Sequence, residues 1–256
     1  MYVSLDDYLV KRWSNAKLAE NEKVRDINPE KLQASLFFRN KVRNIVTKAQ
    51  RVSEETAMMT REMANEFEKS ISIQRERVYE ERNRILETKD FSQFDFKALA
   101  HEVFEHDLKT EHIDNEDEVV HYIYNNLSFN FNDVSLSQHM QTREEIIQYL
   151  TNQFSKQLDD NLKIANDDYF KLRFFQKAIL KAIDVEWINQ VDQLQQLKAS
   201  VNNRQNGQRN AIFEYHKVAL ETYETMIINI KRSIIRNLCL SILTFDNKQD
   251  LVIHFP

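Results

Sequence analysis

The segment HEVFEH, at His101–His106, brings together side chains that could bind a metal ion. On a helix, His101 and Glu105 lie one turn apart, as do Glu102 and His106, so either pair could supply two ligands. The zinc protease motif requires a second histidine four residues after the first, and Glu105 occupies that position. We therefore interpret the segment as a helix face with paired surface side chains. A metal-dependent helical enzyme is the alternative that the segment leaves open.

The residue pattern supports neither nucleophilic catalysis nor nucleotide binding. The only cysteine, Cys239, lies in the apolar run LCLSILTF with no histidine nearby, which indicates a packed thiol. The only glycine is Gly207. A P-loop needs two glycines and a dinucleotide fingerprint needs three, because only glycine lets the backbone approach phosphate closely. We expect no catalytic residue, no metal site and no cofactor within this chain.

The scarcity of glycine and proline also sets the fold class. The 256 residues include one glycine and two prolines, Pro29 and Pro256. Hairpins usually need residues with positive φ, so a fold of strands and turns is disfavoured. With 42% hydrophobic residues the chain can still bury a core. The composition predicts an all-α protein.

Charge and hydropathy limit the partners and the location. The net charge of −5 and the isoelectric point of about 5.9 argue against nucleic-acid binding. The opening MYVSLDDYLVKRW is too polar for a signal peptide. The longest apolar runs, such as Leu238–Phe245, are far shorter than the roughly 20 residues that span a bilayer. These features predict a cytoplasmic protein.

One long helix is expected over Arg39–Lys89, which contains no glycine or proline and many good helix formers. At about 1.5 Å per residue it would be roughly 75 Å long. The apolar stripe breaks at Ser53–Thr56 and at Gln74, and it keeps no strict heptad. A two-stranded coiled coil therefore fits poorly, and we expect other helices to pack on this one.

The flanking segments differ in character. Tyr2–Leu5 resembles the end of a strand that feeds a helix capped near Ser4, and Lys17–Glu30 reads as a polar linker. After the long helix, Asp90–Asn161 has its own composition, richer in His, Asn and Asp, and predicts a small separate helical unit.

Two amphipathic helices are expected at Tyr169–Val201 and Ala211–Leu243. The loop between them, Asn202–Asn210, is so short that the helices must fold back antiparallel. The loop carries Arg204 and Arg209 and no acidic residue. It is either a solvated turn or a tip that contacts a partner, and the residues alone leave both open.

Three segments resemble parts of the SecA preprotein translocase ATPase family, in the order in which that family has them. The run KAQRVSEE, with REMANEF and QRERVYEERNRIL, all within Lys48–Leu86, resembles the long scaffold helix. The run LKAIDVEWINQVDQLQQLKASVNNRQNGQRNAIFEYHK resembles the two-helix finger. The opening YVSLDD resembles the end of the second nucleotide-binding domain.

This resemblance implies a division of the chain. Residues 1–30 would be the tail of an upstream nucleotide-binding domain plus a linker, and residues 31–90 the long scaffold helix. Residues 91–165 would be the helical wing domain, and residues 166–256 the two-helix finger with the C-terminal scaffold helix. The chain would then be the C-terminal part of a larger motor, either a natural fragment or a piece cut from it.

The resemblance also implies a function. The parent motor would couple ATP hydrolysis, with ATP and Mg in upstream domains absent from this chain, to protein export through the Sec membrane channel. The implied partners are the upstream nucleotide-binding domains, the channel and exported preproteins, with no nucleic acid. The implied location is cytoplasmic, peripheral at the inner face of the cell membrane. A stand-alone helical adaptor or interaction module is the alternative.

Several positions depart from the family pattern and point towards an accessory-type SecA. Asn206 stands where the finger tip usually has an aromatic residue, Ala211 where it has proline, and Gln190 where it has histidine. The resemblance assigns contact with the channel or substrate to three tip residues and packing between scaffold helix and finger to three others. These are Arg204, Asn206 and Arg209 for the tip, and Phe67, Trp187 and Tyr215 for the packing.

The tip assignment makes a prediction for the complete motor. Replacing Arg204 and Arg209 by alanine should impair export, because arginine offers fixed, charge-assisted contacts to carbonyl and carboxylate groups. Helical content measured by circular dichroism should be unchanged. Normal export by the doubly substituted protein would refute the role of the tip.

Overall fold

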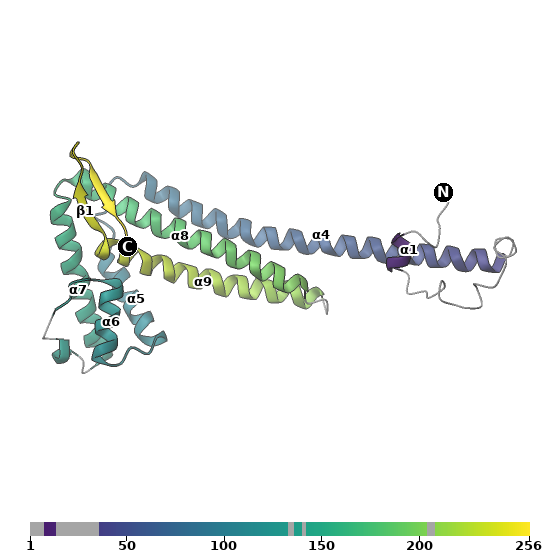
Figure 1. Ribbon diagram of the computed structural model, residues 1–256, viewed down its shortest axis with the longest axis horizontal. Coiled ribbons are helices and arrows are strands. Elements are labelled where there is room, and N and C mark those ends of the chain that lie inside the picture. Colours follow the sequence, from purple (N-terminus) through teal and green to yellow (C-terminus); the bar gives the residue numbers. More distant parts are fainter. Residues whose placement is uncertain (1–7, 14–35, 133–135, 140–141, 204–207) are drawn as a thin grey trace. The chain divides into compact units, whose positions relative to one another are not determined.

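The computed structural model describes residues 8–13, 36–132, 136–139, 142–203 and 208–256 (Figure 1). The chain falls into two compact units, Met1–Lys69 and Ser70–Pro256, and we describe each by itself. The segments Tyr2–Leu5 and Lys17–Glu30, for which we expected a strand end and a linker, lie outside the described residues.

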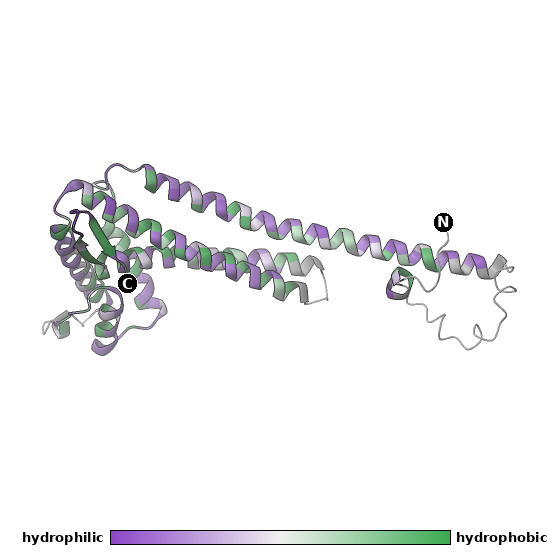
Figure 2. Ribbon diagram, turned by 45° about the horizontal axis from the view of Figure 1, so that its top comes forward, coloured by the Kyte–Doolittle hydropathy of each residue, from purple (hydrophilic) through white to green (hydrophobic). Residues whose placement is uncertain are grey.

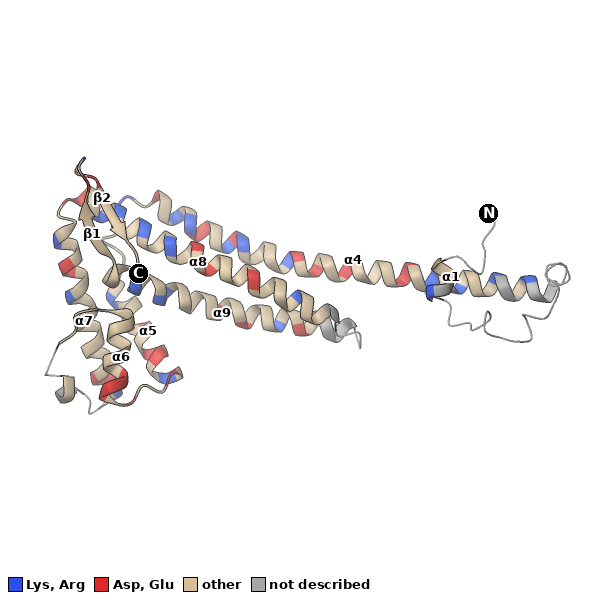
Figure 3. Cartoon of the chain, in the orientation of Figure 1, with Lys and Arg blue, Asp and Glu red and all other residues tan. Residues whose placement is uncertain are grey.

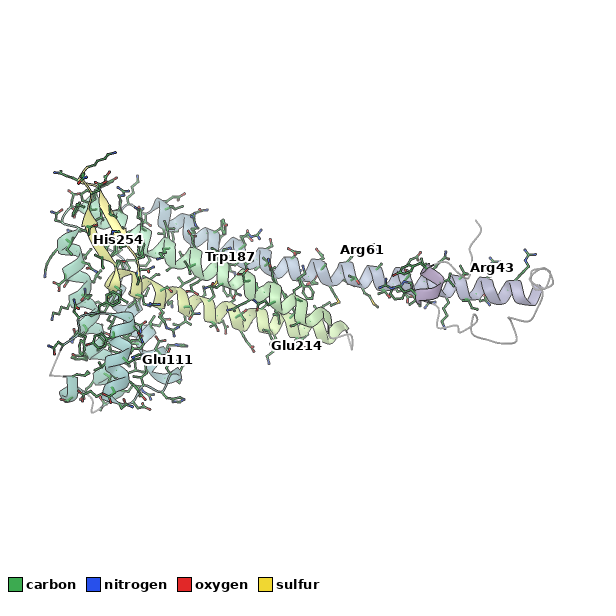
Figure 4. The ribbon with its side chains drawn as sticks, viewed as in Figure 1. Arg43, Arg61, Glu111, Trp187, Glu214 and His254 are labelled. Atoms are coloured by element: carbon green, nitrogen blue, oxygen red, sulfur yellow. The ribbon has the colours of Figure 1, made fainter. Side chains whose placement is uncertain are left out.

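The first unit contains α1 (Tyr8–Trp13) and the first part of α4 (Leu36–Glu87). Val10 and Ala49 are buried, whereas Arg43 and Arg61, labelled in Figure 4, are exposed on α4. An ion pair between Arg51 and Glu55, one turn apart, lies on the surface of this helix. The long helix predicted from composition is therefore confirmed, with ends within three residues of those expected.

Basic and acidic residues are interspersed along α4, as Figure 3 shows. In the second unit its buried positions form one stripe, which consists of Ile71, Gln74, Val78 and Ile85. The helix stops where Asp90 begins a turn, and the Asp90 carboxylate accepts a hydrogen bond from the Ser92 amide at 2.8 Å. Such local side-chain bonding competes with helix continuation and ends it.

Three helices and a short 3₁₀ turn follow: α5 (Phe96–Thr110), α6 (Glu116–Asn126), η1 (Leu136–His139) and α7 (Arg143–Ile164). Each α-helix begins at a side chain that accepts a hydrogen bond from a backbone amide of its first turn. The capping residues are Asp95, Asn115 and Thr142, and Asn115 forms a reciprocal capping box with Glu118. Local sequence therefore fixes where these helices start.

Helices α8 (Asp168–Asn203) and α9 (Gln208–Leu240) run antiparallel, as the short connection required (Figure 1). Helices α5, α6 and α7 lie at the end of this pair away from Asn203 and Gln208. One hydrophobic core runs through all five helices and includes Phe104, Leu150, Phe174 and Leu238. Residues 90–161, which we expected to be separate, thus share their core with α8 and α9.

The chain ends in a hairpin that the sequence analysis did not predict. Strands β1 (Ile242–Phe245) and β2 (Leu251–His254) pair antiparallel, and Figure 2 shows them as largely hydrophobic. The turn needs no glycine, because Gln249 itself adopts φ 63°. The Asp246 carboxylate accepts hydrogen bonds from the amides of Lys248 and Asp250. The all-α class is still confirmed, since helices form nearly all the described regular structure.

Within the described ranges, no helix combines the length and the apolar character needed to cross a membrane.

The turn makes a prediction about stability. A left-handed conformation is unfavourable for glutamine and open to glycine, so Gln249→Gly should stabilise the protein by about 0.5–1 kcal/mol. Gln249→Ala, which removes the side chain but keeps the Cβ, is the matched control and should give no such gain. The urea concentrations at the unfolding midpoints of the parent chain and the two variants measure this difference in stability. Equal midpoints for the glycine and alanine variants would contradict the assigned turn.

Candidate functional site

The predicted finger-tip residues are only partly described. Arg204 and Asn206 lie outside the described residues. Arg209 belongs to the first turn of α9, and only its backbone is described. The tip assignment therefore stays a prediction.

The three predicted packing residues are all buried. Phe67 is 1% exposed, Trp187 is 9% exposed and Tyr215 is 0% exposed. Trp187, labelled in Figure 4, joins the core from α8, and Tyr215 packs edge-on against the ring of His216. Phe67 belongs to the first unit and the other two to the second. Their joint packing between helix and finger stays a prediction.

The HEVFEH segment forms the middle of α5, and His101, Glu102 and His106 have partners on other helices or within α5. Glu102 pairs with Lys231 of α9, and His101 lies 3.5 Å from Glu144 of α7. Nowhere in the part of the chain that the structure describes do three histidine, cysteine, aspartate or glutamate side chains gather as metal ligands do. Cys239 is buried, and burial raises the pKa of its thiol.

Two buried amide side chains and one hydroxyl join α4, α8 and α9. We call this set the amide seam and define it as Gln74, Gln190 and Thr222. Gln190, 1% exposed, donates to Gln74 Oε1 at 2.9 Å and to Thr222 Oγ1 at 3.1 Å. Gln74 in turn donates to the backbone carbonyl of Ala219 in α9 at 2.9 Å. These hydrogen bonds hold the three helices in one register, because a shift of any one would leave a buried amide without its bond.

Further polar contacts lie along the same helices. Arg82 of α4 donates to Asp184 of α8 at 2.8 Å, and this hydrogen bond, followed by the charge of Asp184, raises the pKa of Arg82. Gln176 of α8 donates to the carbonyl of Thr88 just past α4, at 2.9 Å. Asn237 of α9 donates to the carbonyl of Ala178 in α8, also at 2.9 Å. The part of α4 that lies in the second unit, residues 70–87, is therefore attached to the α8–α9 pair at several levels.

A second polar joint connects α5 and α6 to α9. Asp107 has a side chain with no exposed surface, and Arg232 of α9 donates to both of its carboxylate oxygens, with Nε to Oδ2 at 2.9 Å. Tyr122 of α6 donates its hydroxyl to Asp107 Oδ2 at 2.7 Å. Arg232 also lies 3.6 Å from Glu111, which is labelled in Figure 4. We call Asp107, Tyr122 and Arg232 the buried joint.

The electrostatics of the buried joint favour its charged form. Burial alone would raise the pKa of Asp107, but the hydrogen bonds from Arg232 and Tyr122 and the charge of Arg232 outweigh it and lower that pKa. Burial, and then the nearby Asp107 carboxylate, raise the pKa of Tyr122 well above its ordinary value. Asp107 therefore stays ionised and Tyr122 stays a donor at neutral pH.

Sequence reasoning missed this joint, although a signal was present. In α5 the buried positions Ala100, Val103, Phe104 and Leu108 form an apolar face, and Asp107 falls on that face. An acidic residue at a core position requires a partner. Gln74 gave the same signal, since it interrupted the apolar stripe of the long helix. Neither pattern identifies the partner, which comes from a distant helix.

With this geometry established, comparison with known proteins identifies the family. Residues 38–241 match the model of the SecA Wing and Scaffold domain, a range that covers all but the start of α4 and runs to the end of α9. The chain belongs to this family. The resemblance to SecA drawn from the scaffold and finger segments is confirmed. The division of the chain into wing and finger stays a prediction, and we use these two words only as labels for residues 91–165 and for α8 with α9.

Several curated relatives of this wing and scaffold chain are named "Protein translocase subunit SecA 2". The protein of Staphylococcus haemolyticus is 76% identical over all 256 residues, that of Staphylococcus epidermidis 63% and that of Staphylococcus aureus 54%. In each case the match covers all of this chain and 32% of the relative. The chain thus spans about a third of the length of these relatives.

The buried joint makes a prediction about stability. Arg232→Met should destabilise the chain by about 3 kcal/mol at pH 7, because it leaves a buried carboxylate without its counter-ion. Lys231→Met is the matched control, since it removes the neighbouring, more exposed pair with Glu102, and should cost less than about 1 kcal/mol. Chemical unfolding at pH 7 measures both.

The ion pair of Asp107 and Arg232 also predicts that stability depends on pH. Because the folded pKa of Asp107 is lowered, its stabilising contribution is fully present above the unfolded value of about 4 and disappears as the pH falls through the folded value. In Arg232→Met the buried Asp107 loses its counter-ion, and burial then raises its pKa. The difference in stability between the parent chain and Arg232→Met should therefore shrink as the pH falls, first through the raised pKa of the variant and then through the lowered pKa of the parent. Equal costs for the two substitutions at pH 7 would show that the joint is not a stabilising ion pair.

Proposed function

We propose that this chain is the wing and scaffold region of a SecA-type motor that couples ATP hydrolysis in its other domains to protein export through the Sec membrane channel. The membership of the family supports the proposal, as do relatives named as protein translocase subunits. The ATP and Mg would be bound outside this chain. The partners would be the nucleotide-binding domains of the motor, the channel and exported preproteins, at the inner face of the cell membrane.

The observation that carries the proposal is the amide seam. A force applied along α4 reaches the finger only if α4 cannot slide past α8 and α9. Gln74 and Gln190 oppose sliding, because each amide is buried and bonded across a helix boundary. Because of the seam, α4 and the finger would move together as one body.

The wing would follow the same movement. Arg232 and Lys231 of α9 hold Asp107 and Glu102 of α5, and Arg236 of α9 donates to the carbonyl of Asn125 in α6 at 3.1 Å. Asn161 of α7 donates to the carbonyl of Leu238 in α9 at 2.7 Å. Every wing helix is therefore bonded to α9, and a displacement of the finger base would carry the wing with it.

The test replaces both amides of the seam in the complete motor. The double variant Gln74→Leu, Gln190→Leu should fold, because replacing both partners of a buried hydrogen bond by apolar groups is close to neutral. Its ATP hydrolysis should persist while protein export falls several-fold, because the helices can then slip. Gln193→Leu, which changes an exposed glutamine of α8, is the matched control and should export normally.

Stability measurements accompany the export assay. The single variant Gln190→Leu should lose about 1–3 kcal/mol, since Gln74 is left with a buried oxygen and no donor. The double variant should recover most of that loss. Normal export by a folded double variant would reject the seam as the coupling element.

A further inference from the structure

The outer edge of strand β1 has backbone groups available for a further strand. In the hairpin, the Asp246 amide donates to the Asp250 carbonyl at 3.0 Å, so this pair turns its backbone groups towards each other. Along an antiparallel ladder, hydrogen-bonded pairs alternate with pairs that are not hydrogen-bonded. The other hydrogen-bonded pairs of this hairpin are therefore Thr244 with Val252 and Ile242 with His254. Leu243 and Phe245 therefore turn their amide and carbonyl groups away from β2. Neither amide donates a hydrogen bond to any of the described residues.

The sequence of this edge lacks the residues that normally prevent strand pairing, although α7 contacts β1. Natural edge strands are protected by lysine, proline, bulges or a covering element. The sequence of β1 is Ile-Leu-Thr-Phe, without charge or proline. The side chains of Ile242 and Phe245 are 59% and 42% exposed. An edge of this kind is a template on which a further strand can pair.

A groove of about 710 Å³ adjoins the start of β1. Its walls are α7, residues Leu127–Asn132 after α6, and the segment Cys239–Leu243. Phe129 and Ile164, 57% and 44% exposed, provide apolar surface at this groove. The arrangement places a helix and an exposed strand edge on either side of one groove, which suits an extended peptide.

The polar lining of the groove indicates the chemistry of the occupant. It consists mainly of amides and hydroxyls: Ser128, Asn130, Asn132, Gln153, Gln157, Asn161 and Ser241. The charged side chains there, Lys156 and Asp160, are opposite in sign and close enough that Lys156 lowers the pKa of Asp160, after the larger effect of Lys163. Asn161 already donates to the carbonyls of Leu238 and Cys239, and Ser241 donates to that of Asn237. The amides of Asn130, Asn132 and Gln157 can both donate and accept, so they can bind peptide groups whatever the sequence. A nearly neutral, amide-lined groove fits an uncharged extended chain.

We propose that the edge of β1 and this groove bind an extended, uncharged polypeptide segment as a third strand, and that the segment belongs to a protein in transit. Leu243 and Phe245 would exchange backbone hydrogen bonds with it, and its alternate side chains would lie against Ile164 and Phe129. A sequence-tolerant lining suits varied unfolded clients better than one folded partner strand. The identity of the client rests on the proposed function, whereas the strand site does not.

The test uses the 256-residue chain and a synthetic peptide of about twelve residues, alternating threonine and valine with a lysine at each end, long enough to cover the edge. Fluorescence anisotropy of the labelled peptide measures binding, which should saturate. The same peptide N-methylated at every second residue keeps one donating edge and should bind with similar affinity. N-methylation of consecutive residues removes both edges and should weaken binding at least tenfold. Equal binding by all three peptides would overturn the proposal.

Amide hydrogen exchange locates the binding. A saturating amount of the unmodified peptide should slow exchange at Leu243 and Phe245 by about tenfold or more, and leave Thr244 and Val252, already paired in the hairpin, nearly unchanged. Unchanged exchange at Leu243 and Phe245 would overturn the proposal, as would slowing of both with chain concentration alone, which would assign the edge to a second copy. If exchange at Leu243 and Phe245 is unchanged while export still depends on the amide seam, only the strand site is rejected and the proposed function stands.

Discussion

The architecture of the second unit depends on a carboxylate that has no access to water. Asp107 would be strongly unfavourable in the core of α5, and it is tolerated because Arg232 and Tyr122 supply charge-assisted hydrogen bonds from two other helices. This requirement fixes α5 and α6 against one particular turn of α9. Apolar packing alone is non-directional and would permit neighbouring arrangements of the same helices. The buried joint selects one of them and thereby sets the position of the wing on the finger base.

The amide seam applies the same logic at the middle of the helix bundle. Gln74, Gln190 and Thr222 occupy positions where apolar residues would pack with less penalty, and their mutual bonds make sliding between α4, α8 and α9 unfavourable. The proposed transfer of movement from α4 to the finger would require resistance along the helix axes more than maximal stability. The seam and the joint together provide this resistance from α4 through the finger to the wing. The hairpin at the end of α9 then lies on a rigid base, with its outer edge open to a further strand.

The sequence predicted the long helix and the antiparallel finger because runs without glycine or proline, striped with apolar residues, have few alternatives to helix. It failed at the hairpin, because LCLSILTF reads equally as buried helix or strand and because the turn uses Gln249 and the Asp246 carboxylate in place of glycine. Asp107 and Gln74 were visible as polar residues on apolar faces. Their partners were not, since Arg232 is 125 residues from Asp107 and Gln190 is 116 residues from Gln74. Which side chains meet at that separation depends on the tertiary packing of the helices and on no local pattern.

The central claim is that wing, finger and residues 70–87 of α4 form one cooperative body held by the joint and the seam. Native-state amide hydrogen exchange in increasing denaturant measures it most directly, because it gives the opening free energy of each helix separately. The account predicts that the slowest amides of α5, α7, α8 and α9 merge into one opening reaction with a common free energy. A wing whose helices open together at a clearly lower free energy, while α8 and α9 stay closed, would contradict it.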